Sequence, residues 1–156
     1  MPVEKSAGAV IFRKDYNPPT TSSHPPSGGR APKKIYYLLL HYQSGHWDFP
    51  KGNIEKGEKL AETVKRETKE ETGLGDIKFI PGFKEAIKYF YKLKEKNIFK
   101  IVTFFLAETR TKDVKISWEH LGFKWLSYQE ALEQITFKNA KEILQKANNF
   151  LSRKGL

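Results

Sequence analysis

The sequence contains no cysteine, and this absence excludes a disulfide framework, a thiolate zinc site and a cysteine nucleophile. It also has no uninterrupted apolar stretch near the roughly eighteen residues that a transmembrane helix needs. The first residues, Met1 to Ser6, lack the apolar run of a signal peptide. We therefore expect a cytoplasmic protein with no membrane association.

The composition is that of a folding chain with a strongly basic surface. Of the 156 residues, 38% are hydrophobic and 13% are aromatic, which is too apolar for a disordered chain. A chain of this length can bury a core as one domain spanning residues 1–156. Lysine and arginine number 28 against 18 acidic residues, a net charge of +10. The basic residues are dispersed, so the charge is consistent with a phosphate-rich ligand, with nucleic acid or with a solvated surface alone.

Residues 17–32 differ in kind from the rest of the chain. This segment holds five of the eight prolines and no large apolar residue. Strand-like segments flank it at residues 6–13 and 35–41. The pattern predicts a hairpin expanded by a flexible loop insertion, which we expect to have no catalytic role.

The remaining chain alternates between strand-like and helical patterns. Apolar residues at helical spacing predict a helix over residues 60–72, and Gly73 stands where a helix ends. Ser127 and Glu130 form a capping box that opens a short helix. Further strands are predicted at 77–80, 83–93, 99–106 and 123–126, a turn at 94–97 and a closing helix at 137–151. This order favours an α+β domain, a mixed α/β/α sandwich.

Three glutamates near the end of the first helix form the clearest chemical pattern. Glu67, Glu70 and Glu71 stand at positions i, i+3 and i+4, so their carboxylates leave one edge of a helix. Like charges at this spacing repel each other, and a divalent cation among them would remove the repulsion. Oxygen ligands without cysteine or histidine favour Mg²⁺, or Mn²⁺, over zinc. Taken alone, the pattern also fits an exposed, solvated acidic face.

The glutamates belong to a longer motif of 23 residues that resembles the Nudix hydrolase box. Its charged and glycine positions are all filled, and Thr68 departs from the pattern where an aliphatic residue is usual. We expect Thr68 to face the core, so that the departure affects packing only. The matching positions are Gly52, Glu58, Arg66, Glu67, Thr68, Lys69, Glu70, Glu71, Thr72, Gly73 and Leu74.

The resemblance implies a Nudix fold, with a mixed sheet between helices, and an enzyme that hydrolyses a nucleoside diphosphate linked to another group. It implies that Glu67, Glu70 and Glu71 are catalytic carboxylates that hold Mg²⁺ together with the backbone carbonyl of Gly52. It also implies that Glu58 and Arg66 tie the loop to the helix. In such an enzyme the cation neutralises the phosphates and acidifies a water, a carboxylate accepts the proton, and the water attacks phosphorus in line.

Outside the box, the chain resembles the diadenosine tetraphosphate hydrolases of animal and archaeal type. The resemblance covers nearly everything except residues 17–32. It rests on His46-Trp47-x-x-Pro50-Lys51-Gly52, Gly82-Phe83-Lys84, Tyr89, Lys100, Leu106-Ala107-Glu108, Ser117-x-Glu119-His120 and Trp125. It implies that His46, Lys51 and Lys100 hold a polyphosphate, that Tyr89 and Phe137 clamp an adenine, and that Glu119 is a further catalytic, metal-binding acid.

Several alternatives stay open at this point. Each of the five substrate-binding candidates could be an ordinary surface, turn or core residue. An enzyme acting on the 5′ triphosphate of RNA, or on another nucleoside-diphosphate derivative, would use the same box. A Nudix module that binds nucleotide or RNA without hydrolysis would be expected to lack some of the acids that are present here. A monomer is the favoured oligomeric state.

Overall fold

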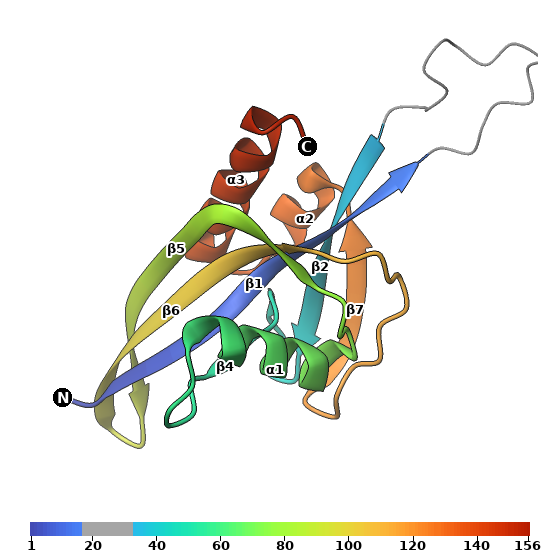
Figure 1. Cartoon of the computed structure of the whole chain (residues 1–156). Coiled ribbons are helices and arrows are strands. Elements are labelled where there is room, and N and C mark those ends of the chain that lie inside the picture. The colour runs from blue at the N-terminus through green and yellow to red at the C-terminus, as the bar shows by residue number, and fades with distance from the viewer. Residues whose placement is uncertain (17–32) are drawn as a thin grey trace, which may run out of the picture.

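The computed structural model describes residues 1–16 and 33–156, which form a mixed sheet with helices on both faces (Figure 1). This confirms the predicted α+β architecture, while the predicted loop insertion at 17–32 lies outside the described residues. No helix of the described part is long and apolar enough to cross a membrane. In chain order the elements are β1 Val3–Tyr16, β2 Lys33–Tyr42, β3 Trp47–Asp48, β4 Lys51–Asn53, α1 Leu60–Thr72, β5 Lys78–Leu93, β6 Lys96–Glu108, β7 His120–Leu126, α2 Tyr128–Gln134 and α3 Lys138–Arg153.

Strand β1 is the centre of the sheet. One of its edges pairs in parallel with β6, while the other pairs antiparallel first with β4 and then with β2. The β1–β2 pairing, from Phe12 opposite Tyr37 to Tyr16 opposite Lys33, confirms the predicted hairpin. The β1–β4 pairing sets Ala7 opposite Gly52, so β1 fixes the strand that opens the Nudix-like motif.

Alternation along β1 builds a core on each face of the sheet. Val10 and Phe12 are fully buried in the cluster beneath α2 and α3, whereas Ala9 and Ile11 are fully buried in the cluster beneath α1. Figure 1 shows α1 on the opposite side of the sheet from α2 and α3. Glycine is needed at Gly8, because a Cβ there would lie 2.4 Å from the carbonyl oxygen of Pro50. This close approach brings β4 against β1.

Helix α1 has the predicted bounds. Gly73 ends it in the left-handed conformation (φ 76°), and its N–H donates to the carbonyl of Lys69 over 2.9 Å. Val64 and Thr68 are buried on the side that packs on the sheet. The expectation that Thr68 faces the core is confirmed.

Several predicted strand boundaries were wrong, and two short strands were missed. The predicted strands at 77–80 and 83–93 form the single strand β5, whose register shifts between Phe79 and Lys84. The turn that follows is shorter than predicted, because Lys94 and Glu95 alone make it with positive φ values of 49° and 67°. Strand β7 starts at His120 rather than at 123. The short strands β3 and β4 were not predicted.

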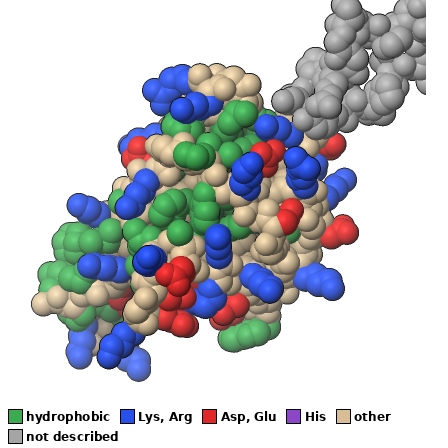
Figure 2. All heavy atoms as spheres, viewed as in Figure 1, with side chains coloured by type: hydrophobic (Ala, Val, Ile, Leu, Met, Phe, Trp, Pro, Cys, Tyr) green, Lys and Arg blue, Asp and Glu red, His purple; other side chains and the backbone are tan. Residues whose placement is uncertain are grey.

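Charge is spread over the surface. Figure 2 shows lysine and arginine side chains distributed over the visible face, between acidic and apolar ones, rather than gathered in one patch. This agrees with their dispersal in the sequence, and it leaves recognition of an anion to local clusters of residues.

Candidate active site

A cavity of about 580 Å³, here called the acidic cavity, opens between β4, α1 and the loop before β7. The structure brings together there all the residues that the sequence nominates as metal ligands or catalytic acids. It is lined by Lys51, Gly52, Asn53, Glu67, Glu70, Glu71, Ser117, Trp118 and Glu119. Four carboxylates from two distant parts of the chain therefore border one space.

Strand β4 meets α1 at Gly52. A Cβ built on Gly52 would lie 1.9 Å from the carboxyl carbon of Glu67, so no other residue fits there without moving that side chain. The carboxylate of Glu67 thus stands directly against the Gly52 backbone. Pairing of Gly52 with Ala7 holds this part of β4 in place.

Glu71 departs from the expected exposed acidic cluster. It is only 5% exposed, because the face of α1 that carries it packs toward the sheet, whereas Glu70 and Glu119 are exposed. The backbone N–H of Lys51 donates to Glu71 Oε2 over 3.2 Å. Burial, and then the nearby charge of Glu67, raise the pKa of Glu71 to about 9. Burial also raises the pKa of Glu67.

Arg66 ties the loop to the helix. Its guanidinium donates to Glu58 through Nε (2.7 Å) and Nη2 (3.0 Å), and Nη2 also donates to the carbonyl of Asn53 over 3.0 Å. The Nη1 group donates to Glu67 over 2.8 Å and to Glu70 over 3.3 Å. The hydrogen bonds from Arg66 contribute most to lowering the pKa of Glu58, to about 2. The Glu58–Arg66 pair has the geometry of the structural pair implied by the motif.

The loop before β7 is attached to the rest of the site through its backbone. The N–H of Ser117 donates to the carbonyl of Glu71 over 3.3 Å. Gln43 makes two further contacts, from its N–H to the carbonyl of Glu119 (3.3 Å) and from Nε2 to the carbonyl of Trp118 (3.0 Å). These bonds bring the Glu119 segment beside the end of α1.

The donors of the acidic cavity suit a hard divalent cation. Carboxylate oxygens and the close-packed Gly52 backbone border it, without sulfur or imidazole, and this chemistry favours Mg²⁺ or Mn²⁺. Within residues 1–16 and 33–156, no three acidic or histidine side chains are already gathered closely enough to enclose a metal ion. Glu67 and Glu70 pair with Arg66 instead.

A second cavity of about 550 Å³, here called the aromatic cavity, lies on the other side of Lys51. It gathers all five residues nominated for substrate binding, which come from four separate segments of the chain. Lys51 lines both cavities, so the two spaces meet at its side chain. The aromatic cavity is lined by His46, Asp48, Lys51, Ile87, Tyr89, Tyr91, Lys100, Phe137 and Asn139.

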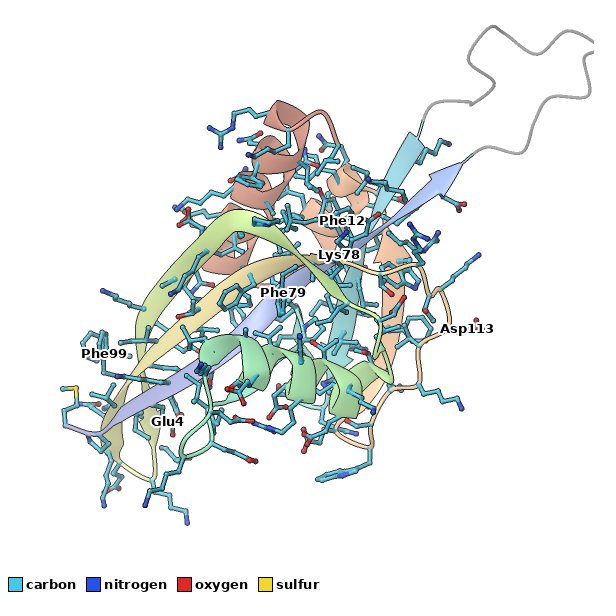
Figure 3. The ribbon with its side chains drawn as sticks, viewed as in Figure 1. Glu4, Phe12, Lys78, Phe79, Phe99 and Asp113 are labelled. Carbon is cyan, nitrogen blue, oxygen red and sulfur yellow. The ribbon has the colours of Figure 1, made fainter. Side chains whose placement is uncertain are left out.

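Two lysines give the aromatic cavity its positive charge. Lys51 Nζ lies 3.1 Å from the buried carboxylate of Asp48. Burial alone would lower the pKa of Lys51, but the charge of Asp48 and neighbouring groups offsets it and the pKa is raised. Lys100 Nζ lies 3.9 Å from Glu4, and burial, followed by repulsion from Lys51, lowers its pKa. Figure 3 shows Glu4 at the same end of the sheet as Phe99, next to Lys100 in β6.

Aromatic rings form the walls of this cavity. Tyr89 and Tyr91 point to the same face of β5 with ring centroids 6.4 Å apart, because side chains two residues apart share a face of a strand. The imidazole of His46 stacks on Tyr42 at 4.6 Å and lies 5.3 Å from Phe137. Burial lowers the pKa of His46.

Some lining residues were not singled out from the sequence. Asp48 and Asn139 carry no local pattern that marks them, and only the fold brings them to the cavity. Tyr91 could have been found by extending the alternation from Tyr89. Trp118 fills the variable position of the Ser117-x-Glu119-His120 pattern, so the resemblance implies no role for it.

The chain is similar to known proteins in sequence and in fold. The chain is 34% identical over 153 residues to the asymmetrical bis(5′-nucleosyl)-tetraphosphatase of Sus scrofa, covering 94% of this chain and 95% of the relative. A crystal structure of an Ap4A hydrolase from Caenorhabditis elegans in a binary complex superimposes with a TM-score of 0.75 at 30% identity, covering 96% of this chain and 98% of the other. An RNA pyrophosphohydrolase from Nitratiruptor is 27% identical over 136 residues, covering 80% of this chain and 86% of that relative.

The family itself follows from a broader match. The model of the NUDIX domain matches residues 30–147, which include every residue that lines the two cavities. This match agrees with the motif and with the shared fold. The chain therefore belongs to the Nudix hydrolase family.

Proposed function

We propose that this Nudix hydrolase cleaves dinucleoside polyphosphates, and specifically diadenosine tetraphosphate to ATP and AMP. The observation that carries the proposal is the meeting of the acidic and aromatic cavities at Lys51. A nucleotide base in the aromatic cavity would direct its phosphate chain past Lys51 toward the carboxylates. The names of the relatives from Sus scrofa and Caenorhabditis elegans support the same substrate class.

The aromatic cavity supplies the two kinds of contact that such a substrate needs. In the proposed complex Tyr89 and Phe137 clamp an adenine between their rings. Lys51, Lys100 and His46 contact the polyphosphate, the lysines as cations and the histidine as a hydrogen-bonding ring. The exposure of Phe137, at 49%, leaves its ring free for this contact.

The acidic cavity would hold the cation and carry out the chemistry. We propose that the carboxylates of Glu67, Glu70, Glu71 and Glu119 and the carbonyl of Gly52 bind Mg²⁺, or Mn²⁺ in its place. Such a cation neutralises phosphate oxygens and lowers the pKa of water. One of the four carboxylates accepts the proton of the attacking water, while Lys51 helps to orient the phosphates.

Product analysis with a panel of substrates tests the proposal. With Mg²⁺ present, we expect diadenosine tetraphosphate to yield ATP and AMP faster than other substrates are cleaved. Release of pyrophosphate from triphosphorylated RNA as the faster reaction would contradict the proposal and favour RNA 5′-end processing instead. Binding of nucleotides without any metal-dependent product would identify a non-catalytic module.

We further propose that residues 1–156 act as one Nudix domain interrupted at 17–32. The NUDIX match from residue 30 to 147 supports this, and so does the pairing of β1 with strands inside the matched region. Limited proteolysis that releases two separately folded parts would contradict it.

A further inference from the structure

Trp118 is placed where an aromatic side chain is unusual. It lines the acidic cavity and is 84% exposed, more than any other large apolar side chain in the described part of the chain. An indole that faces water gains nothing from burial, so its position is not explained by packing of the core. It stands next to Glu119 in the wall of the acidic cavity, and it does not line the aromatic cavity that holds Tyr89 and Tyr91.

The backbone that carries this indole is fixed. The carbonyl of Trp118 accepts a hydrogen bond from Gln43 Nε2 over 3.0 Å, and the neighbouring carbonyl of Glu119 accepts one from the Gln43 N–H. On the other side, the N–H of Ser117 donates to the backbone carbonyl of Glu71 in α1. An exposed ring on an anchored backbone can serve as a flat binding surface with little ordering cost.

The two cavities and the indole follow one another along the surface. The aromatic cavity shares Lys51 with the acidic cavity, and the acidic cavity has Trp118 in its wall. A ligand with one base between Tyr89 and Phe137 therefore passes its phosphates through the acidic cavity before it reaches Trp118. This order matches a molecule with a base at each end of a polyphosphate.

We propose that Trp118 is the stacking platform for the second nucleobase of a dinucleoside polyphosphate. The inference rests on the proposed function and adds a specificity-determining residue to it. Stacking on an indole tolerates any base, because every nucleobase has a π face. The second base is therefore recognised as an aromatic ring rather than by its hydrogen-bonding edge.

The test compares two ligands that differ only in the second nucleoside. For Trp118→Ala we expect kcat/KM for diadenosine tetraphosphate to fall about tenfold, mainly through KM, as stacking energies of nucleobases on aromatic residues indicate. The inhibition constant of adenosine 5′-tetraphosphate, which has the same phosphate chain and one base, should stay unchanged. Trp118→Phe should restore most of the loss.

Phe90→Ala is the matched control, because Phe90 is 64% exposed and points away from Tyr89 along β5. An equal loss for both ligands, or no loss for either, would overturn the role of Trp118. The wild-type reaction reports separately on the proposed function, since failure to cleave diadenosine tetraphosphate would refute the function and the inference together. A wild-type protein that cleaves it, with an unchanged Trp118→Ala variant, refutes the inference alone.

Discussion

Glu71 combines burial with acidic neighbours, two conditions that disfavour a charged carboxylate. Among the described residues, the hydrogen bond to its carboxylate comes from the N–H of Lys51 over 3.2 Å. Burial and the charge of Glu67 account for its raised pKa. The proposed cation, bound beside Glu71, would offset both effects and would favour the charged carboxylate.

We expect Glu71→Gln to lose turnover and keep its fold. Loss of one carboxylate from the proposed metal site should cost several kcal/mol of transition-state stabilisation, or at least about a hundredfold in kcat. Removing the repulsion should leave the metal-free Tm equal to wild type or about 2–4 °C higher. Thermal unfolding with and without MgCl₂ checks this, since Mg²⁺ should raise the wild-type Tm more than that of the variant. An equal Mg²⁺ response in both proteins would count against Glu71 as a ligand.

Tyr89 and Lys100 are expected to act by different forces. Tyr89→Ala should weaken binding of an adenine-bearing substrate by about 1–3 kcal/mol, and the loss should persist at high salt. Lys100→Ala should weaken binding of any polyphosphate, and its effect should shrink as salt rises. Dissociation constants at low and high ionic strength measure both. A salt-sensitive loss for Tyr89→Ala would argue against stacking.

The types of these side chains could be predicted from the sequence better than their environments. Spacing alone brings Glu67, Glu70 and Glu71 to one edge of a helix. The burial of Glu71 could not be predicted, because it depends on how α1 packs against β4. The resemblance implies no role for Trp118, and only the fold shows that it lines the acidic cavity.

Between elements, the contact of Arg66 with Glu58 joins α1 to the loop after β4. Glu58 keeps its charge down to about pH 2, since Arg66 lowers its pKa. Because the pKa of Glu58 is lower in the folded than in the unfolded chain, its interaction with Arg66 stabilises the fold fully at every pH above the unfolded pKa. This stabilisation is lost as the pH falls from the unfolded pKa toward 2.

We expect Glu58→Gln to lower the Tm by a similar amount at pH 6 and pH 8. The difference from wild type should shrink only in acid, below about pH 4.5, where the unfolded carboxyl of wild type takes up a proton. Thermal unfolding across this pH series measures the effect. If the Tm difference between the two proteins disappeared near neutral pH, a titratable group other than Glu58 would be responsible for the pH dependence.

A second prediction at this scale concerns the contact between β4 and α1. Gly52→Ala should push the Glu67 carboxylate aside, because the new Cβ would lie 1.9 Å from its carboxyl carbon. The atom displaced is the end of a flexible side chain, so the Tm should change little while turnover falls. Gly75→Ala is the matched control, since a Cβ at Gly75 meets nothing within 4 Å. Equal activity of the two variants would show that the close contact between the Gly52 backbone and the Glu67 carboxylate is not needed for turnover.

Elements whose ends carry strong local sequence signals were predicted, whereas short elements without such signals were not. Gly73 ends α1 because its left-handed backbone suits glycine, and this information is local. The strands β3 and β4 are two and three residues long and exist only through their partners β2 and β1. Strand β5 continues through Pro81 and Gly82, which read as a break in the sequence, because β6 pairs with it on both sides.

At the scale of the whole molecule, the two points where the described chain breaks off around residues 17–32 lie far from the proposed site. The insertion departs from Tyr16 and returns at Lys33, whereas β4 pairs with β1 at Ala7. The part of β1 between Ala7 and Tyr16 is roughly 30 Å long, at about 3.3 Å per residue. Figure 1 shows these ends of β1 and β2 pointing away from β4 and α1.

Deletion of Ser22 to Gly29, which lies outside the described residues, should therefore leave kcat/KM on diadenosine tetraphosphate within about twofold of wild type. Steady-state kinetics of the deletion variant measure this. A large loss would instead identify the insertion as part of substrate binding.

The parallel pairing of β1 with β6 has a consequence for synthesis of the chain. Val3 pairs with Phe99 and Phe12 with Glu108, so the central strand meets this neighbour only after most of the sequence has left the ribosome. Until then β1 offers one open edge, and its buried apolar residues have no complete core to enter. Contacts so distant in sequence form slowly because loop closure precedes them. Chains truncated before β6 should therefore aggregate rather than accumulate as a smaller folded unit.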